Sequence, residues 1–317
     1  MKAITYKRFG SVNVLRLEDV KKPIPSEDQV LVRVHATTVN SGDCHLRSGK
    51  PFMARLFAGP LVPRQKILGS TYSGTIEALG SKVEGFQLGD QVFGSLGIQS
   101  GSHAEYIKVE ATSIMKKKPS HLSHEEAASL VFGSLSGKYF LDRANISKKA
   151  KVLIIGAGGG VGAYATQYAK SLGAFVTGMC SGESADFVRS LGADQIIDYR
   201  QEALSNYRGA FDIILDMVGR EKLSVIDKAL TDKGRYVTTV ARLDLMVKKI
   251  FARKKSKAYI FDIDKSKAED LESLIDLVNK KTLRPLIDQV FKIDQVQEAH
   301  LRVEASNKRG AVVVTMT

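Results

Sequence analysis

A run of apolar residues that opens directly into a cluster of glycines constrains the fold more than any other feature of this chain. Residues 151–170 read KVLIIGAGGGVGAYATQYAK: an apolar strand, a glycine-packed turn and the start of an amphipathic helix. In the fingerprint Ala157-x-Gly159-x-x-Gly162, alanine replaces the usual first glycine of a dinucleotide-binding turn. Gly159 would let the backbone approach a pyrophosphate, Gly162 would let helix and strand pack closely, and the helix N-terminus offers free N–H groups. The sequence therefore predicts a dinucleotide site formed by Ala157, Gly159, Gly160, Val161 and Gly162. The alternative is a tight turn that binds no ligand.

The same stretch is the longest uncharged segment of the chain, which raises the question of a membrane span. Five glycines and two tyrosines between Lys151 and Lys170 argue against a span. Met1 leads directly into the alternating pattern KAITYKRF, which leaves no room for a signal peptide. Cys44 and Cys180 are too few for a disulfide framework or a four-thiolate zinc lobe. We expect a soluble cytoplasmic protein without a membrane span.

The length of 317 residues is enough for about two domains. A content of 44% hydrophobic and 26% charged residues is typical of globular proteins and excludes disordered and collagen-like classes. The first third alternates apolar and polar residues, as at Gln29–Ala36, with glycines between the short strands. From residue 123 onward strands alternate with helices, which predicts a doubly wound parallel sheet with helices on both faces. We predict one domain from residues 1–122 and 283–317, and a second from 123–282.

The pattern places the individual elements as follows. Strands are expected at 29–36, 72–79, 90–93, 103–109, 152–155, 175–179, 195–199, 211–217, 235–240 and 259–263. Helices are expected at 123–142, 161–172, 184–191 and 266–280, with Gly173 and Gly192 ending two of them. Residues 286–317 are β-like and are expected to return to the first domain.

The residues that follow the second strand of the parallel sheet favour NADPH over NADH. A site specific for NAD places Asp or Glu there, hydrogen-bonded to the ribose 2′-hydroxyl. Here the segment reads Met179-Cys180-Ser181-Gly182, without a carboxylate. Ser181 can donate to a 2′-phosphate, and Tyr199 and Arg200 end the next strand beside it. The nearby carboxylate of Glu183 is the argument for NADH.

Positive charge exceeds negative charge by 13, and this excess favours anionic ligands. One segment holds six of the cations without an acid between them: Lys248, Lys249, Arg253, Lys254, Lys255 and Lys257. The alternative interpretation of the segment is a solvated loop. Because no RNA-binding pattern interleaves aromatic residues with these cations, we expect no nucleic-acid partner.

The chain resembles the medium-chain dehydrogenase/reductase superfamily along nearly its full length. The segments that carry the resemblance are VNSGDCHLRSG (39–49), ILGSTYSGTIEALGSKVEGFQLGDQVFG (67–94), the AGGGVG turn, LGADQIIDY (191–199) and FDIILDMVG (211–219). It implies an α/β protein with a GroES-like β-barrel catalytic domain and a Rossmann cofactor domain. It also implies a homodimer in which the strand at residues 259–263 pairs across a two-fold axis, which would cover an open sheet edge.

The resemblance also shows where this chain departs from the zinc-dependent alcohol dehydrogenases of the superfamily. Asn40 stands at the position of their zinc-binding cysteine, and Ser70 at that of their zinc-binding histidine. An amide and a hydroxyl cannot replace thiolate and imidazole on zinc, so no metal is expected. What remains is similar to the zinc-independent quinone oxidoreductases, including NADPH-dependent enone and alkenal reductases. This branch implies hydride transfer to quinones or to the C=C bond of α,β-unsaturated carbonyls.

Several site residues are carried over from the resembled branch. Asn40 would hydrogen-bond the cofactor or a substrate oxygen, Asp43 would hold the loop, and His45 would deliver a proton. Tyr72 would line the pocket. Further cofactor contacts are expected from Ser136, Val218 and Arg309. The alternatives are a loop amide for Asn40, a structural carboxylate for Asp43, a surface side chain for His45, a core side chain for Tyr72 and a solvated cation for Arg309.

Two other functions remain open at this level. One is reduction of a different activated alkene, such as an anionic one attracted by residues 248–257. The other is a protein that keeps the dinucleotide fold but binds RNA or a membrane surface. The small-molecule reductase is favoured because the glycine turn is intact and Asn40 is present.

Overall fold

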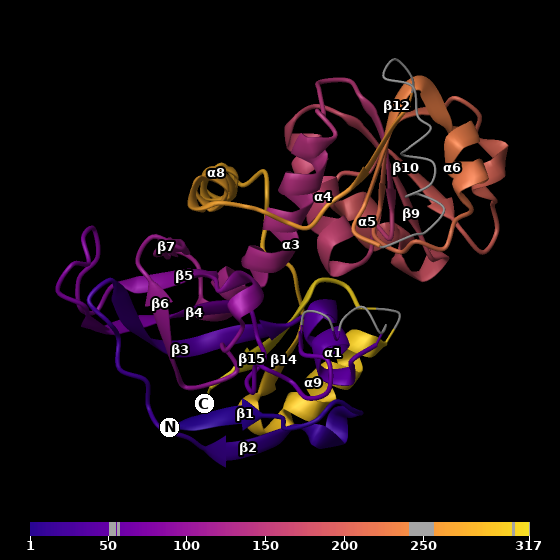
Figure 1. The fold of residues 1–317 in the computed structure, drawn as a ribbon. Helices are drawn as coiled ribbons and strands as arrows, with labels where there is room; N and C mark the ends of the chain where they lie inside the picture. Colours follow the sequence, from indigo (N-terminus) through magenta and orange to yellow (C-terminus); the bar gives the residue numbers. More distant parts are fainter. Residues whose placement is uncertain (51–54, 56–57, 241–256, 306–307, 317) are drawn as a thin grey trace. The chain divides into compact units, whose positions relative to one another are not determined.

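The computed structural model describes residues 1–50, 55, 58–240, 257–305 and 308–316 (Figure 1). The chain folds into two compact units. The first comprises residues 1–132, 267–275 and 285–317, and the second comprises residues 133–266 and 276–284.

The first unit is built around a seven-stranded sheet in which β3 is the long central strand. The strands of the unit are β1 (Lys2–Thr5), β2 (Arg16–Asp19), β3 (Gln29–Val39), β4 (Thr71–Leu79), β5 (Gln91–Ser95), β6 (Tyr106–Glu110), β7 (Ile114–Lys117), β14 (Ile287–Lys292) and β15 (Ala311–Thr315). The main path of the sheet runs β14-β15-β3-β4-β5-β7, and β6 pairs with β3. Valines 30, 32 and 34 of β3 are buried in the core, as their alternation predicts.

The C-terminal segment corrects one prediction. Residues 286–317 return to the first sheet as expected, since β15 pairs antiparallel with β3. They are not all β-like, because α9 (Val296–Glu304) lies between β14 and β15. Val296, Ala299, His300 and Val303 are buried at a spacing of three and four residues, which is the period of a helix face rather than of a strand. The other helix of this unit is α1 (Ser41–Ser48).

The second unit is a six-stranded parallel sheet in the order β10-β9-β8-β11-β12-β13. Its strands are β8 (Lys151–Ile155), β9 (Phe175–Cys180), β10 (Gln195–Asp198), β11 (Phe211–Asp216), β12 (Leu230–Thr238) and β13 (Ala258–Phe261). Its helices are α4 (Gly160–Ser171), α5 (Ala185–Ser190) and α6 (Leu223–Ala229), whereas α3 (His124–Arg143) and α8 (Ala268–Asn279) each belong partly to both units. Figure 1 shows α4 and α5 on one side of the sheet and α6 on the other. The predicted Rossmann architecture is confirmed.

Glycines end two helices of this unit as predicted. Gly173 (φ 76°) follows α4, and Gly192 (φ 99°) follows α5. At such angles an L side chain is strained, so glycine stops the helix at little cost. β12 begins earlier than its apolar pattern indicates because it contains a bulge, where the register moves from Phe211↔Leu230 to Ile213↔Arg235.

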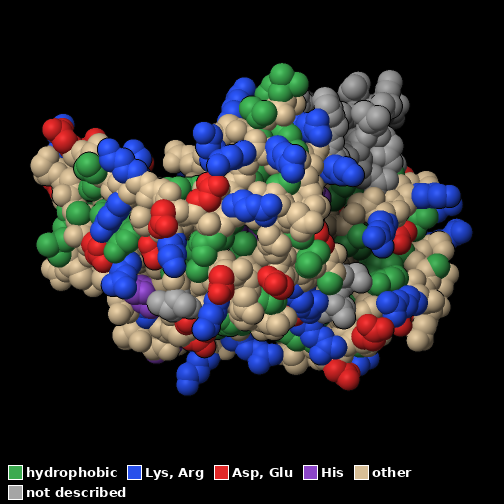
Figure 2. All heavy atoms as spheres, turned by 90° about the horizontal axis from the view of Figure 1, so that it is seen from below, with side chains coloured by type: hydrophobic (Ala, Val, Ile, Leu, Met, Phe, Trp, Pro, Cys, Tyr) green, Lys and Arg blue, Asp and Glu red, His purple; other side chains and the backbone are tan. Residues whose placement is uncertain are grey.

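No described helix has the length and apolarity that crossing a bilayer would require. Figure 2 shows Lys and Arg side chains spread over the face seen from below, with Asp and Glu side chains between them. Of the basic segment 248–257, residues 248–256 lie outside the described residues. Lys257 lies 4.0 Å from the carboxylate of Asp227.

Candidate functional site

The glycine turn connects β8 to α4 in the second unit. β8 ends at Ile155, the chain reverses at Gly156 (φ 86°), and Gly159 is the N-cap of α4 with ordinary extended angles. The first helical hydrogen bond runs from the amide of Ala163 to the oxygen of Gly159, at 2.9 Å. The amide groups before it belong to Gly160, Val161 and Gly162. These N–H groups lie at the positive end of the helix dipole, where an anion is stabilised.

The two glycines of the fingerprint have different roles. A Cβ atom on Gly162 would lie 2.2 Å from the carbonyl oxygen of Gly156, so α4 packs closely on the turn only with glycine there. A Cβ atom on Gly159 would meet only that same oxygen, at 3.3 Å. The fold therefore requires glycine at 162, whereas at 159 it leaves space beside the backbone.

Ala157 has a structural role in the turn, and its contact with a cofactor stays a prediction. Its side chain is fully buried, and its amide donates to the carbonyl oxygen of Met179 at 3.2 Å. Ala157 therefore ties the turn to the end of β9 and has neither a side chain nor an amide to offer a ligand. The amides that precede the first helical hydrogen bond belong to the residues after it.

The residues predicted to select the cofactor lie at the ends of β9 and β10. Ser181 follows β9 and is half-buried, with its hydroxyl 3.4 Å from that of Ser184. Tyr199 follows β10 and is half exposed. The guanidinium of Arg200 pairs with the carboxylate of Glu183 at 3.0 Å. The acid that argued for NADH is thus partly neutralised by a cation that also lies at this edge of the sheet.

Val218 and the buried Asp216 support the turn from the neighbouring strand. The side chain of Val218 abuts Gly156, where an added Cβ atom would lie 2.8 Å from its Cγ2. Asp216 ends β11, and its Oδ1 accepts the amides of Val218 and Gly219 at 2.9 and 2.8 Å. Tyr236 donates to its other oxygen at 2.8 Å. Sequence reasoning missed the role of Asp216, although an acid that ends an apolar strand was a signal for it.

Ser136 lies in α3 and is buried. Its hydroxyl donates to the carboxylate of Asp264 at 2.6 Å. The proton of this hydroxyl is therefore used within the protein, and only its oxygen can accept a bond from a ligand. A contact of Ser136 with the cofactor stays a prediction.

In the first unit, Asn40 and Asp43 form a reciprocal capping box at the start of α1. Asn40 Oδ1 accepts the amide of Asp43 at 3.1 Å, and Asp43 Oδ2 accepts the amide of Asn40 at 2.8 Å. Asp43 Oδ1 also accepts the amide of Gly69 at 3.0 Å. Burial raises the pKa of Asp43 above its ordinary value, and these two amides oppose the shift. The Asp43 carboxylate thus links the start of α1 to the segment that contains Gly69.

The positions of the two absent zinc ligands meet in space. Asn40 Nδ2 donates to Ser70 Oγ at 3.1 Å. Across the described part of the chain, no three His, Cys, Asp or Glu side chains are arranged to hold a metal ion. The side chains at these two positions are an amide and a hydroxyl. Both can donate and accept hydrogen bonds, but both are poor ligands for zinc.

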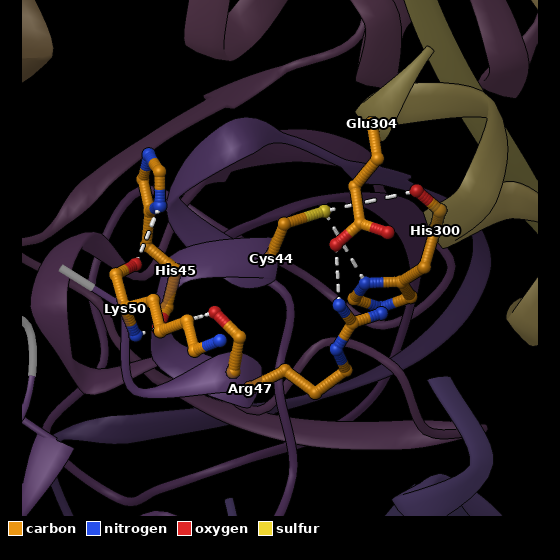
Figure 3. Close-up of polar contacts among 7 residues, drawn as sticks. Cys44, His45, Arg47, Lys50, His300 and Glu304 are labelled. Atoms are coloured by element: carbon orange, nitrogen blue, oxygen red, sulfur yellow. Dashed lines mark hydrogen bonds and ion pairs between the residues drawn. The ribbon is translucent and has the colours of Figure 1, made fainter. Parts of the chain in front are cut away.

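Beyond the capping box, α1 and α9 bring together a polar cluster (Figure 3). His45 is exposed, and its Nδ1–H donates to the carbonyl oxygen of Lys50 at 2.8 Å. The thiol of Cys44 lies 3.5 Å from Nδ1 of the buried His300. The buried guanidinium of Arg47 pairs with Glu304. A cavity of about 270 Å³ opens here, lined by Ser41, Cys44, His45, Ser48, Lys50, Val303 and Glu304.

Cys44 shows no sign of a reactive thiolate. Burial and the nearby Asp43 raise its pKa to about 12. His300 is held neutral, since burial lowers its pKa to about 2. A neutral histidine beside a protonated thiol forms no thiolate–imidazolium pair. His45, whose Nε2 is left free by the bond to Lys50, is the histidine of this cavity suited to proton transfer.

Tyr72 lies where its alternative as a core side chain places it, and its contact with the pocket stays a prediction. Its side chain is fully buried in the hydrophobic core of the first unit. Burial raises the pKa of its hydroxyl, which has no hydrogen-bond partner among the described residues. Arg309 is exposed in the first unit, where its backbone amide donates to Asp288 at 2.6 Å. Its contact with a cofactor phosphate stays a prediction.

Removal of the Asp43 carboxylate should destabilise the first unit strongly. Asp43→Ala leaves the buried amides of Asn40 and Gly69 without acceptors, at about 1–3 kcal/mol each. We expect the free energy of unfolding to fall by about 2–5 kcal/mol in urea titrations. Asp186→Ala, at a carboxylate that is 98% exposed, is the control and should change it by less than about 0.5 kcal/mol. Equal effects of the two substitutions would contradict the assigned role.

The buried His300 and the half-buried His124 should make the protein less stable in mild acid. Burial is the main cause that lowers the pKa of His300 to about 2 and that of His124 to about 4, whereas both titrate near 6.5 when unfolded. Between pH 6.5 and about 4 the unfolded chain therefore binds more protons. The free energy of unfolding should fall with pH, by up to about 1.4 kcal/mol per pH unit for each histidine.

The measurement is urea unfolding at pH 7.5, 6 and 5 in the wild type and in His300→Asn. In the variant, the free energy of unfolding should depend less steeply on pH than in the wild type, whatever its value at pH 7.5. His121→Asn changes an exposed histidine, and its free energy of unfolding should depend on pH as steeply as that of the wild type. Parallel pH profiles of the wild type and His300→Asn would show that His300 is not the buried neutral group described here.

Comparison with known proteins identifies the family of the chain. The family models described as Alcohol dehydrogenase GroES-like domain and Zinc-binding dehydrogenase match residues 26–119 and 191–314. The chain is 32% identical to a tomato (Solanum lycopersicum) 2-methylene-furan-3-one reductase, covering 99% of this chain and 79% of the relative. It is 30% identical to the human mitochondrial NAD(P)H oxidoreductase RTN4IP1, covering 100% of this chain and 89% of that protein.

A solved structure gives the same result over the whole chain. The quinone oxidoreductase from Coxiella burnetii is 30% identical, with a TM-score of 0.89, and the match covers 100% of this chain and 99% of that one. The sequence segments that carried the resemblance, the two-unit fold and these relatives all agree. The chain belongs to the medium-chain dehydrogenase/reductase superfamily, in its quinone oxidoreductase-like branch.

Proposed function

We propose that this protein is an NADPH-dependent oxidoreductase that reduces quinones or the C=C bond of α,β-unsaturated carbonyls without a metal ion. The observation that carries the proposal is the pairing of Asn40 with Ser70 at the two positions where zinc-dependent relatives hold their metal. The names of the relatives, among them a furanone reductase, an NAD(P)H oxidoreductase and a quinone oxidoreductase, support the reaction class.

The glycine turn fits a dinucleotide. The amides of Gly160, Val161 and Gly162 would hold its pyrophosphate, and the space beside Gly159 admits the backbone approach that this requires. Ser181 and Arg200 would hold a 2′-phosphate, because no carboxylate follows β9 directly and Glu183 is already paired. Val218 would border the cofactor from the next strand. NADPH is therefore the proposed cofactor.

The residues of the first unit suit reduction of a polarised double bond. When bound, the reduced dinucleotide supplies a hydride, which an enone accepts at its β-carbon. Charge then develops on the carbonyl oxygen of the substrate, and the second amide hydrogen of Asn40 would donate to it. His45, with Nε2 free, would supply the proton to the α-carbon. Reduction of a simple ketone would need stabilisation of an alkoxide, which a metal supplies in the zinc-dependent relatives.

The test is a panel of quinones, enones, alkenals and simple ketones, assayed with NADPH and with NADH. We expect turnover of quinones or enones with NADPH, much weaker turnover with NADH and none of simple ketones. Prior treatment with a chelator should leave the rate unchanged. Loss of activity on chelation, restored by zinc, would overturn the metal-free assignment, and absence of turnover across the panel would overturn the reaction class.

The amide of Asn40 can be tested separately from its capping role. Asn40→Ser keeps an oxygen that caps α1 but removes the N–H donor. We expect kcat on an enone to fall about 100-fold, as for loss of one donor to a developing oxyanion, with Tm nearly unchanged. Asn40→Ala, which also removes the cap, should lower both. An unchanged kcat in Asn40→Ser would exclude the amide from the chemistry.

We also propose that the protein is a homodimer. β13 is the last strand of the parallel sheet, so one edge of this strand has no partner within the described chain. Pairing of two such edges across a two-fold axis would cover them. Sedimentation equilibrium is the measurement that decides this.

A further inference from the structure

A second cavity lies at the opposite edge of the Rossmann sheet from the glycine turn. It has a volume of about 310 Å³ and opens at the amino ends of β8, β11 and β12. The glycine turn follows the carboxyl end of β8, and parallel strands begin at one edge of a sheet and end at the other. Ligands of such sheets bind at the carboxyl edge, so neither the cofactor nor its substrate accounts for this cavity.

The lining of this cavity is strongly cationic. Its positively charged residues are Lys148, Lys149, Lys233 and Arg235. The single carboxylate of the lining, Asp212, already accepts the amide of Lys151 at 2.9 Å and the hydroxyl of Thr231 at 3.2 Å. Arg235 is half-buried and donates one bond, to the carbonyl oxygen of Ala144 at 2.9 Å. The three lysines form no ion pair with any described residue. An anion would relieve the repulsion among these cations.

Irregular backbone on both sides brings the cations to the cavity. Lys149 has φ 67°, in the left-handed region where an L side chain is strained and glycine is favoured. Asn145, with φ 49°, lies in the same loop. On the other side, the bulge of β12 between Leu230 and Arg235 carries Lys233. At this φ glycine would be less strained than lysine, so the backbone at Lys149 carries a cation to the cavity at a cost in stability.

We propose that this cavity binds a small, multiply charged phosphate anion. The volume is at the low end for small-molecule sites, which fits a diphosphate group and a little more. Three unpaired ammonium groups and one guanidinium supply the charge-assisted donors that phosphate oxygens accept. The ligand is either a free polyphosphate or the phosphate end of a nucleotide. This site is separate from the proposed catalytic function and does not depend on it.

The experiment is calorimetric titration of the full chain with inorganic pyrophosphate and with uridine diphosphate, in low salt. The test variant is Lys149→Gly, which removes one cation and relieves the strained backbone. Its matched control is Lys281→Gly, which removes a lysine from another non-glycine position of positive φ (57°), outside the cavity. Lys233→Ala is a second variant, on the other side of the cavity. Tm is measured for each protein.

We expect saturable binding of pyrophosphate at one site that is weakened at least 10-fold in Lys149→Gly and in Lys233→Ala. Lys281→Gly should bind as the wild type does, and Tm of both glycine variants should equal or exceed that of the wild type. Equal affinity for the two ligands supports a free polyphosphate, and tighter binding of uridine diphosphate supports a nucleotide. Absence of saturable binding overturns the proposal. Binding that is unchanged in both cavity variants also overturns it, because pyrophosphate would then occupy the glycine turn or the general surface.

Discussion

Gly162→Ala should strongly destabilise the second unit, whereas Gly159→Ala should fold normally and bind NADPH more weakly. A Cβ atom at position 162 would lie 2.2 Å from the Gly156 carbonyl oxygen, and backbone atoms cannot yield as a flexible side chain does. Such overpacking costs about 3 kcal/mol. At position 159 the nearest atom to an added Cβ is 3.3 Å away and φ is −80°, so alanine fits the fold. There the methyl group would instead occupy the space that a pyrophosphate needs.

The measurements are thermal unfolding and NADPH binding by its fluorescence. For Gly162→Ala we expect a clear fall in Tm. For Gly159→Ala we expect a Tm within a few degrees of the wild type and a Kd for NADPH about 30-fold higher, equivalent to about 2 kcal/mol. Wild-type affinity in Gly159→Ala would mean that the turn is a tight connection without a ligand. That is the alternative the sequence left open.

Ser181→Asp should convert the cofactor preference from NADPH to NADH. The carboxylate would stand directly after β9, where NAD-specific sites hold the ribose 2′-hydroxyl. It would also repel a 2′-phosphate, and like charges in contact cost several kcal/mol. We expect kcat/KM for NADPH to fall by a factor on the order of 100, and that for NADH to rise modestly. Ser181→Ala, without a new charge, should lose about 10-fold with NADPH, as expected for one hydrogen bond to a charged group.

The ratio of kcat/KM values for the two cofactors, with one substrate, decides this prediction. Ser190→Asp is the matched control, because it places the same charge on the end of α5 and should leave the ratio unchanged. If Ser181→Asp retains its preference for NADPH, the 2′-phosphate does not lie beside Ser181. Discrimination would then have to come from Arg200, which pairs with Glu183.

Local pattern was sufficient for much of the fold and for part of the site. The apolar strand, the glycines and the amphipathic helix of residues 151–170 all form as predicted, because each depends on neighbours close in sequence. The ends of α4 at Gly173 and of α5 at Gly192 were also predicted, because a helix end depends on the residues beside it. The pattern failed at α9, where buried residues recur at a helical spacing within a segment rich in β-branched residues.

Side-chain roles were predicted less well, because burial depends on what packs against a residue from elsewhere in the chain. The sequence allows Tyr72 to be a pocket or a core residue, and the surrounding strands place it in the core. Ala157 fits the fingerprint, yet its buried side chain and its bond to Met179 show that it supports the turn. No pattern in the sequence indicated a role for His300. Its neutral state follows from its burial against α1, which the sequence does not show.

Residue type and spacing alone indicate the class of fold and the position of the glycine turn. Three contacts are visible only in the folded chain: Asn40 bonds Ser70, Asp43 joins two segments 26 residues apart, and four cations gather at the amino edge of the sheet. The physical reason is that such contacts join distant parts of the chain. Their geometry is set by packing and by the need of buried polar groups for partners, which no local pattern records.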